Sequence, residues 1–234
     1  MRSPAIFGRS VFAGVVALVS IATAHADITT LYDFKGGSDS QSPWASLISD
    51  PEGNLYGTTY QGGAYCYCGT VFKLAPDGSD TVLHAFTNRD GDGARPVAGL
   101  IRDKAGNLYG TTTNGGHGKG VVFKVAPNGR ETVLHSFQGK SDGAYPWAGL
   151  LQDEAGNLYD TTERGGGDGN FGTVFKLSPD GTETVLHAFG HHPHDGRYSY
   201  AGLMKGRDGE LYGTTFWGGD SNCTCGTVFR LKKK

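Results

Sequence analysis

The chain reads GNLYGTT at 53–59 and 106–112, GNLYDTT at 156–162 and GELYGTT at 209–215. The tyrosines of these copies are 53, 50 and 53 residues apart: Tyr56, Tyr109, Tyr159 and Tyr212. Self-similarity at a period of about 50 residues is typical of propellers and other repeat arrays. The heptad therefore predicts four copies of one structural unit.

Three further signatures recur in fixed order around the heptad. Before it lie TTLYDF (29–34), TVLHAF (81–86), TVLHSF (132–137) and TVLHAF (184–189), and then PWASLISD (43–50), PVAGLIRD (96–103), PWAGLLQD (146–153) and SYAGLMKG (199–206). After it lie GTVFKL (69–74), GVVFKV (120–125), GTVFKL (172–177) and GTVFRL (226–231). These short runs, rich in Val, Thr and aromatics and bounded by glycine turns, indicate β-strands. Four antiparallel strands per unit predict a β-propeller blade.

The combined pattern AGLxxDxxGNLYGTTxxGG, GTVFKLxPDG and TVLHxF resembles the GloVer-type tandem repeat of bacterial extracellular proteins and covers nearly all of 29–231. The resemblance implies a propeller-like fold and brings no defined activity with it. The first two strands of each unit also resemble the NHL and SMP-30-like propellers, with their motif GIAVDxxGNVYVAD. That weaker resemblance places the AGLIRD-type strand innermost, followed outward by the heptad, GTVFKL and TVLHAF.

With this order, blades 1 to 3 are complete and blade 4 lacks its outermost strand. We expect the strand at 29–34 to fill that position. The predicted fold is thus all-β: a four-bladed β-propeller of four-stranded antiparallel blades, closed by the N-terminal strand 29–34, which would remove exposed sheet edges. The alternative to this monomer is an open four-bladed half that pairs with a second chain as a dimer with an eight-bladed ring.

The first 26 residues have the features of a secretory signal peptide. Arg2 and Arg9 precede an apolar run at 11–22, and Ala24-His25-Ala26 gives a cleavage pattern, so we expect the cut before Asp27. A membrane anchor is the alternative. The prediction is a signal peptide at 1–26 and one propeller domain at 27–234, secreted or periplasmic and free of the membrane after cleavage. A formal net charge of −2 argues against a nucleic-acid partner.

The variable loops of the units fall on one face of such a propeller, and binding sites are usually found on loops of this kind. Aromatic side chains and one acid–base pair differ between the copies there, a composition that suits sugar rings or peptide side chains. The alternative is that the two tryptophans at 44 and 147 pack between blades as core. The candidate binding residues are Trp44, Tyr60, Asp92, Trp147, Glu163, Arg164, Tyr200, Phe216 and Trp217.

An aspartate recurs four residues before the proline position of each unit: Asp39, Asp92, Asp142 and Asp195. A ring of carboxylates could hold Ca²⁺, but identical placement in every unit favours turns that lead into the inner strand. We therefore expect no cofactor, with Ca²⁺ as the alternative. The outer-strand histidines 84, 135 and 187 are expected on the surface, as are His191, His192 and His194.

Four cysteines form two C-x-C pairs, Cys66 with Cys68 and Cys223 with Cys225. An even count in an exported chain predicts disulfides. Disulfides between the two pairs could cross-link repeats 1 and 4 at the seam of the ring, or each pair could form a disulfide within itself. Because both cysteines of each pair lie in one repeat and repeats 2 and 3 have none, the sequence favours disulfides within the pairs.

No catalytic residue is evident from the sequence. Propellers serve both as binders and as enzymes, so the fold alone does not decide. The sequence favours a secreted binding or structural module whose extracellular ligand is a carbohydrate or a protein. The alternative is an SMP-30-like metal-dependent lactonase or hydrolase, which by that resemblance would hold its metal with acidic and amide side chains. Here the inner strands are mostly Ala, Gly, Leu and Ile.

Overall fold

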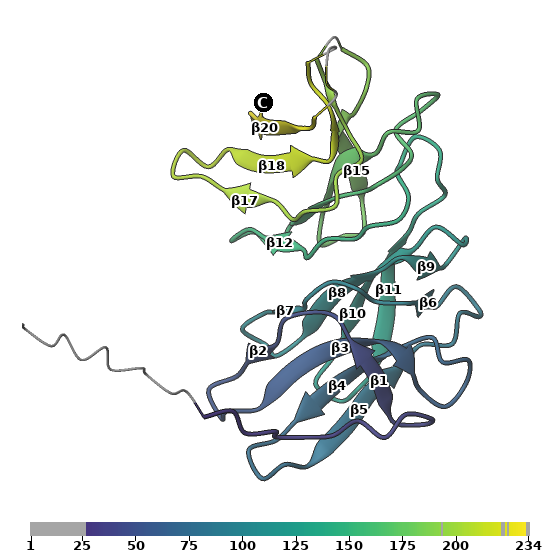
Figure 1. The fold of residues 1–234 in the computed structure, drawn as a ribbon, viewed down its shortest axis with the longest axis vertical. Coiled ribbons are helices and arrows are strands. Elements are labelled where there is room, and N and C mark those ends of the chain that lie inside the picture. The colour runs from purple at the N-terminus through teal and green to yellow at the C-terminus, as the bar shows by residue number, and fades with distance from the viewer. Residues whose placement is uncertain (1–26, 193, 221–222, 224, 233–234) are drawn as a thin grey trace, which may run out of the picture. The chain divides into compact units, whose positions relative to one another are not determined.

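The computed structural model describes residues 27–192, 194–220, 223 and 225–232, so the predicted signal peptide at 1–26 lies outside the described residues. All regular structure in the described part is β-strand (Figure 1). It holds no helix long and apolar enough to cross a membrane. The segment Leu31–Lys234 forms one compact unit.

Each repeat contributes one antiparallel sheet, in the strand order predicted from the sequence. The first strands are β2 (Ile48–Ser49), β7 (Ile101–Arg102), β12 (Leu151–Gln152) and β17 (Met204–Lys205). The heptads form β3 (Leu55–Gly62), β8 (Leu108–Thr112), β13 (Leu158–Thr161) and β18 (Leu211–Thr215). The third strands are β4 (Thr70–Leu74), β10 (Val121–Val125), β14 (Thr173–Leu177) and β20 (Thr227–Leu231).

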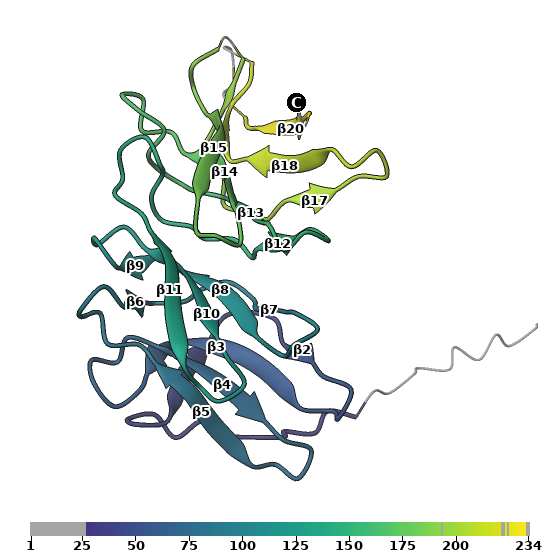
Figure 2. The same ribbon diagram turned by 180° about the vertical axis from the view of Figure 1, so that it is seen from behind.

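The outer strands complete the first three sheets: β5 (Asp80–Ala85), β11 (Glu131–Ser136) and β15 (Glu183–Ala188). Figure 2 shows β15 beside β14 and β11 beside β10. In each of these pairs the register shifts at the same place, before the phenylalanine of the third strand. The sheets therefore repeat in detail as well as in order.

Phenylalanines join each repeat to the next. Phe86, at the end of the first outer strand, meets the ring of Phe123 edge-on with centroids 5.1 Å apart. The same contact recurs between Phe137 and Phe175 at 5.2 Å and between Phe189 and Phe229 at 5.3 Å. Because most of these rings are fully buried, their burial is a main source of cohesion between neighbouring repeats.

The two threonines of the heptad are part of the scaffold. The first donates its hydroxyl to a carbonyl of the next repeat, as Thr58 does to Ala98 at 3.1 Å and Thr111 to Ala148 at 3.1 Å. In repeats 1, 3 and 4 the second bonds to a threonine hydroxyl of the third strand, as in the 2.7 Å contact of Thr59 with Thr70, and in repeat 2 Thr112 accepts the Val121 amide instead. Buried hydroxyls need such partners, so the repeated Thr-Thr is explained by packing.

The predicted strand at 29–34 is absent, and no described sheet closes on itself. β20 pairs only with β18 among the described strands. Phe34 instead meets the ring of Phe72 edge-on at 5.1 Å, the contact that Phe86 makes with Phe123. The segment thus supplies the aromatic contact of an outer strand to repeat 1 without forming a ladder.

Candidate functional site

The loop face is built on small ladders that the sequence analysis did not anticipate. The segment after each outer strand pairs with the residues that follow the heptad. These ladders join β1 (Ser40–Pro43) to the end of β3, β6 (Gly93–Ala94) to β9 (Asn114–Gly115), Ala144 to Arg164, and β16 (Gly196–Arg197) to β19 (Trp217–Gly218). A glycine at positive φ, such as Gly62 at 95°, lets the two backbones approach. The face therefore has a rigid base.

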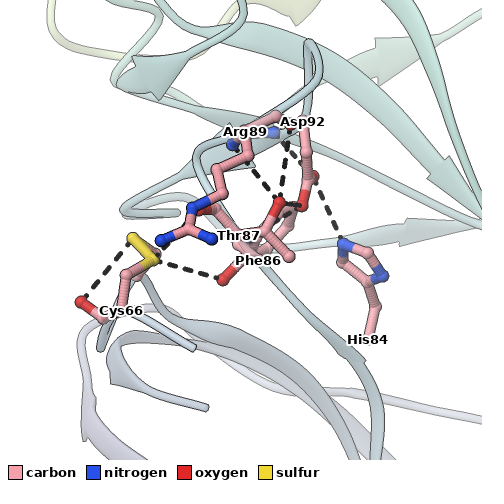
Figure 3. The surroundings of a disulfide bond; sticks show 8 residues. Cys66, His84, Phe86, Thr87, Arg89 and Asp92 are labelled. Carbon is pink, nitrogen blue, oxygen red and sulfur yellow. Dashed lines mark hydrogen bonds and ion pairs between the residues drawn. A yellow bond between two sulfur atoms is a disulfide. The ribbon is translucent and has the colours of Figure 1, made fainter. Parts of the chain in front are cut away.

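The four recurring aspartates hold these loops. Asp92 accepts hydrogen bonds from the amides of Thr87 at 2.7 Å and Gly93 at 2.6 Å, and from the Thr87 hydroxyl at 2.8 Å (Figure 3). Asp39 and Asp195 accept backbone amides in the same manner, and Asp142 accepts that of Gln138. No described hydrogen bond or ion pair joins two of these four carboxylates. Their geometry is that of turns leading out of the outer strand.

The outer-strand histidines were predicted on the surface, but their side chains are partly buried, 18%, 17% and 28% exposed for His84, His135 and His187. Each faces the aspartate that follows its strand: the His84–Asp92, His135–Asp142 and His187–Asp195 pairs are 3.3, 3.5 and 3.1 Å apart. Tyr32 takes the same role, donating its hydroxyl to Asp39. Each histidine ring also meets the phenylalanine at the end of its own strand edge-on, as His84 meets Phe86 with centroids 4.8 Å apart. His191 contacts the carbonyl of Gly166 at 2.9 Å.

Most of the predicted binding residues meet in one group, hereafter the aromatic cluster: Trp147, Tyr200, Phe216 and Trp217 with the pair Glu163–Arg164. Ring centroids are 6.2 Å apart for Trp147 and Tyr200, 5.8 Å for Tyr200 and Phe216, and 5.6 Å for Phe216 and Trp217. The cluster spans repeats 3 and 4. Tyr200, Phe216 and Trp217 are 43%, 62% and 48% exposed.

Polar groups border these rings at fixed positions. Trp147 donates its indole N–H to one Glu163 oxygen at 2.8 Å, and Arg164 Nε lies 3.0 Å from the other. The Arg164 guanidinium also lies over the ring of Tyr198, 4.4 Å from its centroid. Burial raises the pKa of the Tyr200 hydroxyl, assisted by the Glu163 charge, so this hydroxyl remains a hydrogen-bond donor. The cluster thus combines apolar planes with oriented donors and acceptors.

Two hollows adjoin the cluster. One of about 330 Å³ is lined by Tyr200, Phe216 and Cys225 among others. Another of about 460 Å³ is lined by Glu163 and Arg164 with Lys119 and Tyr145. A third, of about 800 Å³, lies at the opposite, tight-turn end of repeats 2 and 3, beside Asp103 and Asp153. Hollows therefore occur also at the end that the sequence analysis set aside.

The remaining candidates lie elsewhere. Trp44 stacks on Tyr60 in repeat 1, with centroids 5.0 Å apart and planes 12° from parallel, and Arg95 lies 5.7 Å from the Tyr60 ring centroid. Trp44 is 63% exposed, so it is not core, whereas Trp147 is partly buried. Asp92 belongs to the loop turn described above. The structure therefore groups six of the nine candidates.

The cysteines close locally, as Cys66–Cys68 and Cys223–Cys225. Figure 3 shows Cys66 beside the strand end that leads into the Asp92 loop, with its sulfur 3.6 Å from the Phe86 carbonyl and 3.2 Å from that of Thr87. Each disulfide therefore constrains one loop of the face, and neither links repeat 1 to repeat 4.

One unusual residue escaped the sequence analysis, although its signal was present. Asp160 stands where the other heptads have glycine, at Gly57, Gly110 and Gly213. A Cβ at Gly57 would lie 2.7 Å from Leu47 and 2.8 Å from Phe72, so the position is apolar and tight. Asp160 is fully buried, and neither carboxyl oxygen forms a hydrogen bond with a described residue. Burial raises its pKa well above the usual value, which indicates a protonated acid.

Solved structures resemble this chain only distantly. A candidate gluconolactonase shares 19% identity over 84% of this chain and 61% of its own, with a TM-score of 0.43. A luciferin-regenerating enzyme shares 17% identity over 80% and 60%, with a TM-score of 0.49. The extracellular domain of a candidate one-component system from B. thetaiotaomicron shares 11% over 81% and 21%, with a TM-score of 0.46. The chain thus spans less than two thirds of each.

No curated protein matches the sequence. The family model described as the Gloeobacter/Verrucomicrobia repeat matches it twice, at residues 8–150 and 117–234. Together these matches cover all four repeats, and they agree with the GloVer-type resemblance carried by the heptads. The chain belongs to the Gloeobacter/Verrucomicrobia repeat family.

Proposed function

We propose that this protein is a secreted binding module that holds carbohydrate on the aromatic cluster. The observation that carries the proposal is the exposure of Tyr200, Phe216 and Trp217 side by side, at positions where the four repeats differ. Exposed aromatic groups on a soluble protein mark interaction sites. Sugar rings present apolar C–H faces to such planes and hydroxyls to the polar groups around them.

The Glu163–Arg164 pair favours a sugar over an apolar peptide side chain. One oxygen of Glu163 accepts a hydrogen bond from the Trp147 indole and the other accepts one from Arg164 Nε, so the carboxylate is held in place. Each oxygen keeps lone pairs for a ligand hydroxyl, and Arg164 keeps further N–H donors. Preorganised groups of this kind bind with a smaller loss of side-chain entropy.

The experiment is binding of soluble polysaccharides by affinity electrophoresis, followed by titration calorimetry with oligosaccharides of any that retard the protein. The test variant, Phe216→Thr with Trp217→Asn, carries the residues of repeat 2, Thr113 and Asn114. Trp44→Ala is the matched control, since it removes an exposed aromatic outside the cluster. We expect the double variant to lose retardation and the control to keep it. Equal retardation of both variants would rule out the cluster as the site.

The four repeats are proposed to form a four-bladed ring in which residues 29–34 pair with β20. Support comes from Val228 on β20, which is 82% exposed while its counterparts Val71, Val122 and Val174 are 0% exposed. Sedimentation of the chain from Asp27 onward is the test. A monomer that becomes less stable on deletion of 27–35 supports the ring. A dimer would instead support the eight-bladed alternative.

A further inference from the structure

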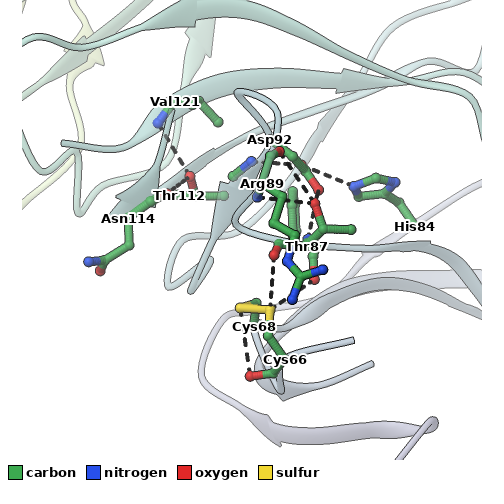
Figure 4. Close-up of polar contacts among 11 residues, drawn as sticks. Cys66, Cys68, His84, Thr87, Arg89, Asp92, Thr112, Asn114 and Val121 are labelled. Atoms are coloured by element: carbon green, nitrogen blue, oxygen red, sulfur yellow. Dashed lines mark hydrogen bonds and ion pairs between the residues drawn. A yellow bond between two sulfur atoms is a disulfide. The ribbon is translucent and has the colours of Figure 1, made fainter. Parts of the chain in front are cut away.

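Three metal-ligating side chains converge where repeat 1 meets repeat 2. His84 lies on β5, Asp92 in the loop that follows, and Glu131 is the first residue of β11 in the next repeat. One imidazole nitrogen and one oxygen from each carboxylate all lie within 4.8 Å of one another. Figure 4 shows the His84 ring facing Asp92, with His84 Nε2 3.3 Å from Asp92 Oδ1. All three side chains are partly buried.

The group holds two carboxylates and one imidazole. Among the described residues, the charged groups that act on Glu131 are His84, which lowers its pKa, and Asp92, which raises it. Glu131 Oε1 is buried and forms no hydrogen bond with a described residue. A buried carboxylate without a partner is costly, so the site as built favours the arrival of a cation.

The geometry points to a binding site for a divalent cation of the Zn²⁺ type, held by His84, Asp92 and Glu131. One imidazole nitrogen and two carboxylate oxygens are ligands that Zn²⁺ accepts, with water in a further position. Asp92 is already oriented by the Thr87 amide and hydroxyl and by the Gly93 amide, which is the role of outer hydrogen bonds in metal sites. A bound ion would join repeat 1 to repeat 2.

The other junctions show which groups the site needs. At the next junction His135, Asp142 and Glu183 repeat the same side-chain types, and His135 Nε2, Asp142 Oδ1 and Glu183 Oε1 are again buried without hydrogen bonds to described residues. Among the described residues, however, only the His84 group brings its ligand atoms within 4.8 Å. In the described part of the chain the His187–Asp195 pair belongs to no such group, so it is a natural control.

Binding of Zn²⁺ to the folded chain alone should raise the thermal midpoint of unfolding as the Zn²⁺ concentration rises.

The test is calorimetric titration of ZnCl₂ into the untagged chain from Asp27 onward, stripped with EDTA and dialysed to pH 7.5. We expect Glu131→Gln and His84→Gln each to weaken Zn²⁺ binding at this site by about tenfold or more, and His187→Gln to leave it unchanged. Glu131→Gln is nearly isosteric, and its thermal midpoint in EDTA confirms folding. Absence of Zn²⁺ binding in the parent chain would overturn the proposal. Unchanged affinity in Glu131→Gln, or loss only when His191, His192 and His194 are replaced, would overturn it too.

Discussion

The two ends of the repeat behave differently. At the tight-turn end, Asp50, Asp103 and Asp153 each bind the asparagine and tyrosine of the following heptad, with tyrosine–aspartate distances of 2.8, 3.0 and 2.9 Å. At the loop face, the residues after the heptad share a backbone ladder, and the two residues that directly follow the heptad differ in all four copies. The comparison indicates that the heptad and its turn, present in every copy, maintain the fold, whereas the proposed carbohydrate site lies where the copies diverge.

The largest effect is expected from the contacts between repeats. Phe123 is fully buried and meets Phe86 edge-on. Phe123→Ala should lower the free energy of unfolding by about 3–5 kcal/mol, measured by urea denaturation. Phe216→Ala is the control, because this exposed ring should change stability by less than about 0.5 kcal/mol. Equal losses of unfolding free energy in the two variants would show that the loop face contributes as much to stability as the contacts between repeats.

The next effect concerns the one heptad that breaks the pattern. Asp160→Gly restores the residue of the other copies and removes a buried carboxyl that has no hydrogen bond to a described residue. We expect a gain of about 1–3 kcal/mol at pH 7 from urea denaturation. Burial raises the pKa of Asp160 in the folded chain, so above about pH 4 this carboxyl ionises more readily in the unfolded chain and favours unfolding. Its removal should therefore stabilise the folded chain. A loss of stability at pH 7 would show that the acid has a stabilising role.

A smaller effect should appear in the pH dependence of stability. Burial raises the pKa of Glu131 and of Glu183 from 4.5 to about 7. At low pH these acids are protonated in the folded and in the unfolded chain. As the pH rises they ionise first in the unfolded chain, so the free energy of unfolding falls between about pH 4.5 and about pH 7. The thermal midpoint in EDTA should decline across this window.

The double variant Glu131→Gln, Glu183→Gln should flatten that decline. The turn aspartates do not contribute to this decline, because they titrate at lower pH. Hydrogen bonds from Asn54 and Tyr56 outweigh the effect of burial and lower the pKa of Asp50 to about 2. A decline of the same steepness in the double variant would assign it to other groups.

The smallest effect on stability is expected at the tight-turn end. Tyr109 donates its hydroxyl to Asp103 at 3.0 Å, and burial followed by this bond raises the pKa of Tyr109 to about 12. Tyr109→Phe should cost about 1 kcal/mol. The matched Tyr212→Phe, in the exposed turn of repeat 4, should cost less. A larger loss for Tyr212→Phe would contradict the expectation that the more buried hydrogen bond contributes more to stability.

Much of the fold could be predicted because the repeat gives each strand four times. The order within each sheet follows from the shared signatures, and the local disulfides follow from pairs that lie within single repeats. Contacts between repeats are less visible in a sequence. The approach of Glu131 to His84 joins two repeats, and so does the contact of Phe34 with Phe72.

The candidate site was predicted in part for the same reason. Divergence between copies identified Phe216, Trp217 and the Glu163–Arg164 pair, and the structure brings them together. Asp160 was missed because it lies inside the most regular motif, where a change of one residue is easily passed over. The position of Trp44 outside the aromatic cluster could not be predicted from its place in the repeat, because equivalent positions in different repeats have different neighbours.

We propose that carbohydrate binds to the divergent loop residues of the aromatic cluster and not to the heptads that all four repeats share. The most direct measurement is polysaccharide retardation of the Phe216→Thr, Trp217→Asn variant together with its free energy of unfolding. We expect the variant to lose retardation while its free energy of unfolding stays within about 0.5 kcal/mol of that of the parent chain. Retained retardation, or a loss of binding that accompanies unfolding, would contradict it.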